Sequence, residues 1–176
     1  MTSYRRLRHP GASYFFTLAL ANRAATTLTD RVDDLRLAFH RVLSFRRAEI
    51  DAIVILPNHL HCVWTLPPAD DDFPTRWRLI KSSFSRGCPP GVRRPSLTAK
   101  QERGVWQRRY WEHCIRDEAD YLTHIRYCWG NPVKHGYVAR AADWPWSSIH
   151  RDIRAGLVDP DWQGGQQDGR YGEIDG

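Results

Sequence analysis

The fold is decided by the stretch Ile-Asp-Ala-Ile-Val-Ile-Leu-Pro-Asn-His-Leu-His-Cys-Val-Trp-Thr-Leu-Pro, residues 50–67. Residues 52–56 are rich in β-branched side chains, which favours a buried strand. Pro57-Asn58 interrupts this strand, and residues 59–66 form a second apolar strand directly after it. The stretch therefore predicts two adjacent strands in one sheet.

Two histidines lie on the second strand, at positions 59 and 61. Because side chains alternate along a strand, His59 and His61 should project from one face, and Leu60, Cys62 and Trp64 from the other. Two imidazoles about 7 Å apart, at ~3.4 Å per residue, can share one metal ion. The alternative is two surface histidines beside a core strand, and the pair alone does not decide between them.

The length of 176 residues suits one domain with its own core. We expect this domain to span residues 1–155 and to be followed by a flexible C-terminal tail, residues 156–176, because the tail is rich in Gly, Gln and Asp. No run of 18 apolar residues and no signal-type segment is present, so we expect a cytoplasmic, nucleoid-associated protein without membrane contact. The four cysteines lie far apart, which indicates reduced core thiols.

The positive charge is concentrated in one part of the chain. The formal net charge is +6, and residues 76–116 hold eleven Arg or Lys against two Glu. Aromatic residues are interleaved with these cations: Trp77, Trp106, Tyr110 and Trp111. Cations neutralise phosphates and aromatic faces stack on unpaired bases, so the mixture favours single-stranded nucleic acid over the alternative of a solvated basic face.

A second constellation follows about sixty residues after the histidine pair. Asp117 is expected to cap a helix that ends near Gly130, before Asn131-Pro132. At 100° per residue, one side of this helix carries a polar stripe: Asp120, His124, Tyr127 and Asn131. The opposite side carries the apolar residues that we expect to pack on the sheet: Leu122, Ile125 and Trp129.

If the polar stripe meets the histidine pair, the group can perform phosphoryl transfer. A divalent ion held by His59, His61 and Asn131 would polarise a phosphodiester and stabilise charge in the transition state. The phenol of Tyr127 would then attack the phosphorus and form a covalent phosphotyrosine. Mixed nitrogen and oxygen ligands suit Mg²⁺ or Mn²⁺.

At these residues the sequence resembles the REP-associated tyrosine transposases, a branch of the single-tyrosine HUH transposases. The similarity runs from about residue 4 to 155, and its motifs are Leu-Pro-Asn-His-Leu-His-Cys-Val-Trp (56–64), Trp-Gln-Arg-Arg-Tyr-Trp-Glu-His-Cys-Ile-Arg-Asp-Glu (106–118), Tyr-Cys-Trp-Gly-Asn-Pro-Val-Lys-His-Gly-Tyr-Val (127–138) and Asp-Trp-Pro-Trp-Ser-Ser (143–148). The resemblance implies an α+β fold with a central antiparallel sheet flanked by helices, of the ferredoxin-like or RRM-like HUH type. It also implies metal-dependent cleavage and rejoining of single-stranded DNA at repetitive extragenic palindromic hairpins.

The resemblance assigns roles to individual residues. His59 and His61 match the metal-binding pair, and Tyr127 matches the nucleophile because it stands at the family's distance from Asn-Pro, unlike Tyr121 and Tyr137. Asn131 occupies the position of a further polar ligand. The sequence departs from the family pattern at Cys128-Trp129-Gly130, where relatives commonly have an Ile and a second aromatic before the Asn, and Gly130 is expected to loosen the end of the helix.

The leading hypothesis is thus a DNA-cleaving and DNA-joining enzyme, and the alternative is a hairpin-binding module without chemistry. A phosphoesterase that uses water is a third hypothesis. We expect a monomer, with a dimer as the alternative, and a tail that either covers the site or contacts the foot of the hairpin. The expected DNA contacts are Arg5, Arg6, Lys81, Arg108, Arg109 and Lys134.

Overall fold

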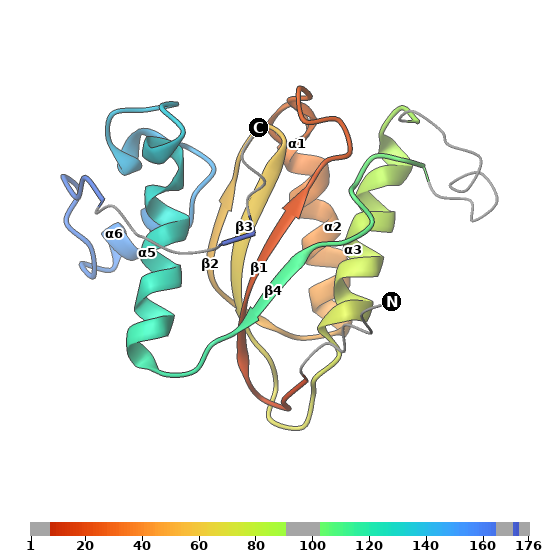
Figure 1. Cartoon of the computed structure of the whole chain (residues 1–176), viewed down its shortest axis with the longest axis horizontal. Coiled ribbons are helices and arrows are strands. Elements are labelled where there is room, and N and C mark those ends of the chain that lie inside the picture. Colours follow the sequence, from red (N-terminus) through yellow and green to blue (C-terminus); the bar gives the residue numbers. More distant parts are fainter. Residues whose placement is uncertain (1–7, 91–102, 165–170, 173–176) are drawn as a thin grey trace.

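The computed structural model describes residues 8–90, 103–164 and 171–172. Within them, the centre of the molecule is a four-stranded antiparallel sheet with strand order β2-β3-β1-β4 (Figure 1). The strands are β1 (Ser13–Ala19), β2 (Glu49–Ile55), β3 (His59–Thr65) and β4 (Trp111–Cys114). The expected single α+β domain with a central antiparallel sheet is confirmed.

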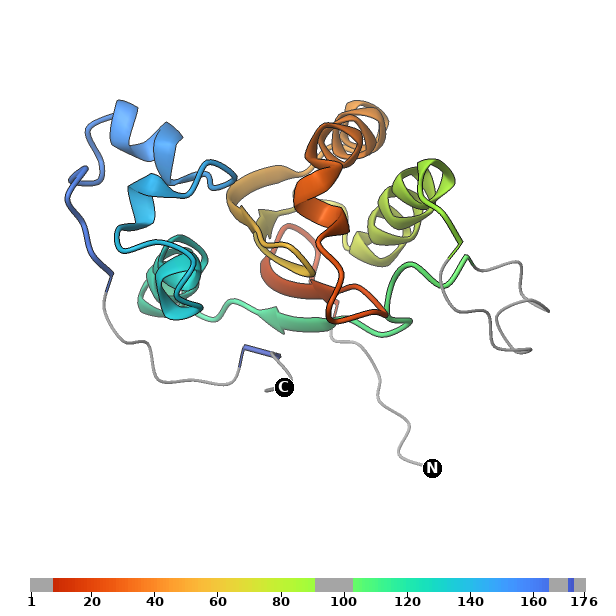
Figure 2. The ribbon, with the colours of Figure 1, turned by 90° about the horizontal axis from the view of Figure 1, so that it is seen from above.

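Helices cover both faces of this sheet (Figure 2). One face carries α1 (Thr27–Asp30), α2 (Val32–Phe45) and α3 (Phe73–Gly87). The other face carries α5 (Glu118–Lys134), a short 3₁₀ turn η1 (Ala141–Asp143) and α6 (Ile149–Arg154). The sheet is therefore the middle layer of three, and its two faces have different partners.

The predicted strand pair is confirmed as β2 and β3, which are joined at Pro57-Asn58. Alternation along β3 directs Leu60, Cys62 and Trp64 into the core beneath α2 and α3. The indole of Trp64 stacks on that of Trp77 from α3, with the ring centroids 4.1 Å apart. His59 and His61 consequently face the opposite way, towards α5.

Strand β1 lies between β3 and β4 and pairs with both. A row of directly paired residues therefore crosses all three strands. Thr17 pairs with His61 of β3 on one side and with Trp111 of β4 on the other. These three side chains lie on the α5 face, because directly paired residues point to the same side of a sheet.

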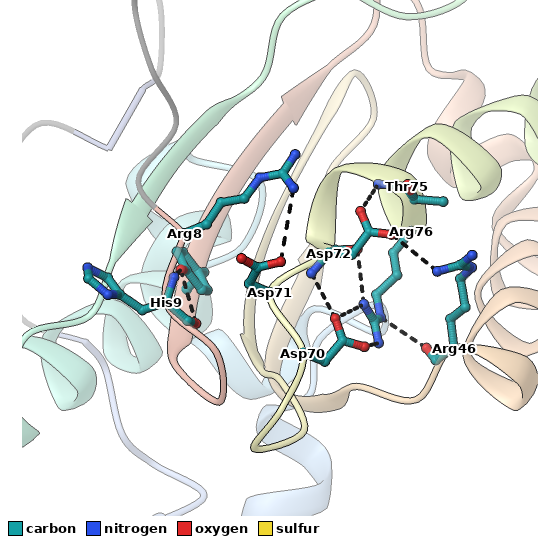
Figure 3. A network of polar contacts seen from close by, with 9 residues as sticks. Arg8, His9, Arg46, Asp70, Asp71, Asp72, Thr75 and Arg76 are labelled. Carbon is teal, nitrogen blue, oxygen red and sulfur yellow. Dashed lines mark hydrogen bonds and ion pairs between the residues drawn. The ribbon is translucent and has the colours of Figure 1, made fainter.

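The side chain of Arg76 in α3 is charged, yet it is only 1% exposed (Figure 3). Its guanidinium pairs with the carboxylate of Asp70 and donates to the backbone carbonyls of three residues: Arg46, Arg47 and Asp72. Asp72 also caps the start of α3, where its carboxylate accepts from the backbone N–H of Thr75. Asp70 and Asp72 thus order the loop that leads into α3.

Helix α5 does not end near Gly130 as expected, because it runs through Pro132 to Lys134. Asp117 caps its start as predicted, and its carboxylate accepts from the backbone N–H of Asp120. A proline in the last turn removes only one backbone donor, so the helix continues.

The chain after α5 is hydrogen-bonded to the edge strand β2. The indole nitrogen of Trp144 donates to the carbonyl of Ile55, and the backbone N–H of Ile55 donates to the carbonyl of Trp146. All four cysteines are free thiols, as predicted. In the part of the chain that the structure describes, no helix combines the length and the apolar character needed to span a bilayer.

Candidate active site

The two imidazoles of β3 are buried beside each other under α5. The ring centroids of His59 and His61 lie 5.1 Å apart, and the ring planes are nearly perpendicular. The predicted placement of both histidines on one strand face is confirmed, and the alternative of two surface histidines is wrong.

Each imidazole is held through its Nδ1 atom. His59 Nδ1 lies 2.6 Å from Oδ1 of Asn58, whose amide nitrogen donates to the carbonyl of Arg23. Because that contact fixes Oδ1 as an acceptor, His59 Nδ1 carries the proton. His61 Nδ1 lies 2.9 Å from the hydroxyl oxygen of Thr17. In both rings Nε2 is then the nitrogen that a divalent cation would use, so the donor set fits such an ion.

Tyr127 meets the histidine pair from α5. Its side chain is 3% exposed, and its ring centroid lies 5.1 Å from that of His61. The ammonium of Lys134, two helical turns later, donates to the Tyr127 hydroxyl over 3.0 Å. A candidate nucleophile and a fixed positive charge therefore stand next to the candidate metal site.

Tyr121 and Tyr137, also near this helix, have different surroundings. Tyr121 is bonded to the carboxylate of Asp51, and burial raises the pKa of its phenol to about 12. Tyr137 stacks on Trp144 with the ring centroids 5.2 Å apart. Of these three phenols, the one against the ring of His61 is Tyr127.

Asn131 and His135 continue the same face of α5 towards His59. Asn131 is 1% exposed and lies one turn after Tyr127. His135 follows one further turn on, and its ring centroid is 5.1 Å from that of His59. Asn131 thus lies between two residues that each contact the histidine pair. The sequence reasoning missed His135, although its spacing of four from Asn131 is a usable signal.

The polar stripe faces the sheet, which corrects the expected orientation of α5 in part. Ile125 packs in the apolar cluster of the same sheet face as predicted, and Trp129 packs against that cluster. Asp120, His124, Tyr127 and Asn131 are all buried, whereas Leu122 is 40% exposed. The sheet face below the stripe is polar at Thr17, His59 and His61, so it offers partners for polar side chains.

At the start of α5, Asp120 joins the helix to β4. Its Oδ2 accepts from Nε2 of His113 over 2.8 Å and from the backbone N–H and Nε of Arg116. Burial by itself raises the pKa of Asp120, but the hydrogen bonds from His113 and Arg116 outweigh it and hold this pKa at about 2. Burial lowers the pKa of His124 on the same stripe, which favours the neutral imidazole.

Among the described residues, one group of three possible metal ligands is present: His113, Asp120 and His124. The rings of His113 and His124 stack with only 18° between their planes, so their lone pairs lie in two nearly parallel planes. Asp120 Oδ2 is already occupied by three donors. This geometry indicates a hydrogen-bonded structural contact.

A segment of the C-terminal tail lies over the candidate nucleophile, which agrees with the hypothesis that the tail covers the site. The ring of Tyr171 stacks on that of Tyr127, with the centroids 3.6 Å apart and 16° between the planes. Thr17 donates its hydroxyl proton to the carbonyl of Tyr171 over 2.5 Å. Segment 171–172 lies at β1 and β4, where it contacts Thr17 and Trp111, and Figure 1 shows it crossing the sheet. No sequence pattern singled out Tyr171 or Thr17.

The expected DNA-binding residues have varied positions. Arg108 and Arg109 are exposed in the segment that leads into β4. Lys81 donates to the carbonyl of Gln107 over 2.7 Å, and Lys134 donates to Tyr127 as described above. Arg5 and Arg6 lie outside the described residues.

No protein-family model matches the chain. The chain is 44% identical over 173 residues to the REP-associated tyrosine transposase of Escherichia coli K12, covering 98% of both chains. It is 42% identical over 166 residues to a putative REP-associated tyrosine transposase of Haemophilus influenzae, covering 93% of this chain and 94% of that one. A solved structure of a REP-associated tyrosine transposase bound to a REP hairpin superposes with a TM-score of 0.87 at 44% identity, covering 99% of this chain and 98% of that one.

Proposed function

Because the chain belongs to the REP-associated tyrosine transposases, we propose that it cleaves and rejoins single-stranded DNA beside palindromic hairpins through a covalent bond to Tyr127. The observation that carries this proposal is the position of the Tyr127 phenol. It lies between the ammonium of Lys134 and the imidazole of His61. A phenol that served only as packing would not need both neighbours.

In the proposed reaction the phenol oxygen of Tyr127 attacks the scissile phosphorus. A bond forms between this oxygen and phosphorus, and the bond from phosphorus to the 3′ oxygen of the preceding nucleotide breaks. The products are a 5′-phosphotyrosine and a free 3′-OH, so the proton lost by the phenol is balanced by the one that the 3′ oxygen gains. The reverse step rejoins DNA, since the covalent bond conserves the energy of the phosphodiester.

Lys134 has a direct part in this step. Its ammonium donates to the Tyr127 hydroxyl, so it fixes the position of the attacking oxygen. As the phenol loses its proton, the same positive charge stabilises the negative charge that develops on the oxygen. Lys134 was expected to contact DNA, and the proposed role in activating Tyr127 is a different one.

His59, His61 and Asn131 would hold a divalent cation, Mg²⁺ or Mn²⁺. When bound, this ion would polarise the scissile phosphate and stabilise its negative charge in the transition state. Asn58 and Thr17 orient the two imidazoles from behind. The burial of all three candidate ligands excludes bulk water from the reacting groups.

The proposed substrate is a REP hairpin with an adjoining single strand. The related protein of the solved structure is bound to such a hairpin, and this chain has the same fold over nearly its whole length. Arg108 and Arg109 are exposed before β4, where they can neutralise phosphates of a strand that leads to the site.

The experiment is a denaturing gel of the full chain incubated with labelled single-stranded palindromic repeats and Mn²⁺. We expect a protein-linked DNA band that requires the ion and is lost in Tyr127→Phe. Tyr137→Phe is the matched control, because this phenol stacks on Trp144 away from His61, and it should keep the band. A metal-dependent cut that survives Tyr127→Phe would indicate hydrolysis by water, and binding without any cut would indicate a hairpin-binding module.

A further inference from the structure

Thr17 stands between the candidate metal site and the C-terminal tail. It lies in the middle of β1, directly paired with His61, and is 5% exposed. Its hydroxyl oxygen contacts two groups: Nδ1 of His61 at 2.9 Å and the carbonyl oxygen of Tyr171 at 2.5 Å.

The protons in this chain of hydrogen bonds can be assigned. A carbonyl oxygen only accepts, so the single hydroxyl proton of Thr17 is donated to Tyr171. The Thr17 oxygen must then accept from His61, which places a proton on Nδ1 of that imidazole. In the neutral ring, Nε2 consequently carries the lone pair, and this is the tautomer that binds a metal ion through Nε2.

We propose that Thr17 is a positioning residue that fixes His61 as the metal-binding tautomer, and that the docked tail enforces this by accepting the Thr17 proton. The inference rests on the proposed function, because it takes His61 as a metal ligand. Without the tail, the Thr17 hydroxyl is able to donate to Nδ1 instead, which selects the tautomer with its proton on Nε2. Tail docking and metal binding therefore favour each other, and the coupling is reciprocal.

A close fit holds the tail in the position that this contact requires. Gly172 has a φ of 70°, and a Cβ added there would lie 2.3 Å from Cβ of Trp111. Trp111 pairs directly with Thr17, so the glycine packs in the same transverse row as the hydroxyl. Gly172→Ala should therefore displace the tail in the full chain, since neither the backbone angle nor the space admits a side chain.

Gly156→Ala is the matched control for this substitution. Gly156 has nearly the same φ, 71°, but a Cβ there meets nothing within 4 Å. It thus introduces the same backbone strain without disturbing the contact with Trp111.

The first test reads the tautomer without any metal. The ¹⁵N chemical shifts of the His61 ring are measured by NMR in the metal-free full chain. We expect Nδ1 to be protonated and Nε2 to be unprotonated in the wild type and in Gly156→Ala. Gly172→Ala should shift the ring towards a mixture of both tautomers. A proton on Nε2 of His61 in the wild type would overturn the inference. Unchanged ¹⁵N chemical shifts of the His61 ring in Gly172→Ala would also overturn it.

The second test measures the dissociation constant of Mn²⁺ by calorimetry in the absence of DNA. Thr17→Val is nearly isosteric but lacks the hydroxyl, so the constant should rise about 10- to 100-fold, as for other residues that orient a ligating histidine. Thr17→Ser keeps the hydroxyl and should stay within about threefold of the wild type. Gly172→Ala should raise the constant by about two- to tenfold, since a smaller fraction of the chain has the competent tautomer.

The double variant separates this coupling from other effects of the tail. In the Thr17→Val background, Gly172→Ala should not raise the dissociation constant of Mn²⁺ any further. The hydroxyl that links His61 to the carbonyl of Tyr171 is absent there. An equal rise in both backgrounds, or tighter Mn²⁺ binding in Gly172→Ala, would refute the coupling. None of these measurements uses DNA. If the full chain formed no tyrosine-linked DNA, the proposed reaction would be refuted, but the NMR and Mn²⁺ measurements would still test the role of Thr17.

Discussion

Both faces of the sheet bury apolar side chains, and they differ in the polar groups that they carry. The face under α5 has an apolar cluster of its own, in which Phe15 and Val63 of the sheet pack with Ile125 of the helix. The face under α2 and α3 is apolar along β1 and β3: Tyr14, Phe16, Leu18, Leu60, Cys62 and Trp64. The face under α5 carries the polar groups of the site from the same two strands: Thr17, His59 and His61. Since neighbouring residues of one strand point to opposite faces, one seven-residue segment, β3, serves both purposes.

The difference shows where a small domain places its buried polar groups. Apolar burial contributes about 25 cal/mol per Å² and needs no specific partner, so it stabilises the sheet from both faces. Buried polar groups are costly unless they are hydrogen-bonded. On the α5 face they are connected to one another, as in the contacts of His59 with Asn58, of His61 with Thr17 and of Asp120 with His113.

The contrast is tested most strongly by one substitution on each face of β3. Trp64→Ala removes an indole that stacks on Trp77, and we expect the free energy of unfolding to fall by about 4 kcal/mol. His61→Ala removes a smaller ring whose partner Thr17 keeps its hydrogen bond to the carbonyl of Tyr171, and we expect about half of that loss or less. Urea denaturation followed by circular dichroism measures both. An equal loss on the two faces would contradict the division.

A second prediction concerns pH and the carboxylate that joins α5 to β4. Hydrogen bonds in the folded chain hold the pKa of Asp120 at about 2, below its ordinary value of 3.8. A depressed carboxyl pKa stabilises the fold above the unfolded pKa, and this stabilisation is lost as the pH falls through the folded one. Asp120→Asn should therefore cost about 2 kcal/mol near pH 6, and the cost should shrink between about pH 4 and pH 2.

Unfolding in urea at a series of pH values measures this dependence. Glu118→Gln, an exposed carboxylate on the same helix, is the control and should show a much smaller difference from the wild type. A cost of Asp120→Asn that stayed constant from pH 6 to pH 2 would show that the ionised carboxylate is not what stabilises the contact.

The sequence predicts the parts of this contrast that follow from local periodicity. Alternation in residues 50–67 was sufficient to place His59 and His61 on one face of β3. The spacing of Tyr127 and Asn131 was sufficient to place both on one side of α5. These predictions succeed because strand and helix geometry relate neighbouring residues directly.

Periodicity fails where a partner distant in sequence decides the environment. Arg76 has the charge of a surface residue, yet it is buried because carbonyls at the end of α2 and the carboxylate of Asp70 satisfy it. For α5, the sequence placed Ile125 correctly against the sheet but also placed Leu122 there, which is exposed, because the polar groups of the sheet face beneath the helix could not be read from α5 alone. Thr17 and Tyr171 are 154 residues apart, and no local pattern links them.

The smallest expected effect concerns the tail on the polar face. The ring of Tyr171 stacks on the candidate nucleophile, so DNA that reaches Tyr127 must displace it. Such a stack is worth about 1 kcal/mol, which corresponds to roughly fivefold in an equilibrium constant. Tyr171→Ala should therefore strengthen hairpin binding at saturating Mn²⁺ by up to about fivefold, as measured by fluorescence anisotropy. Leu157→Ala, an exposed residue earlier in the tail, should leave the affinity unchanged. Weaker binding in Tyr171→Ala would mean that this ring contacts the DNA, and the tail would then belong to the binding surface of the polar face.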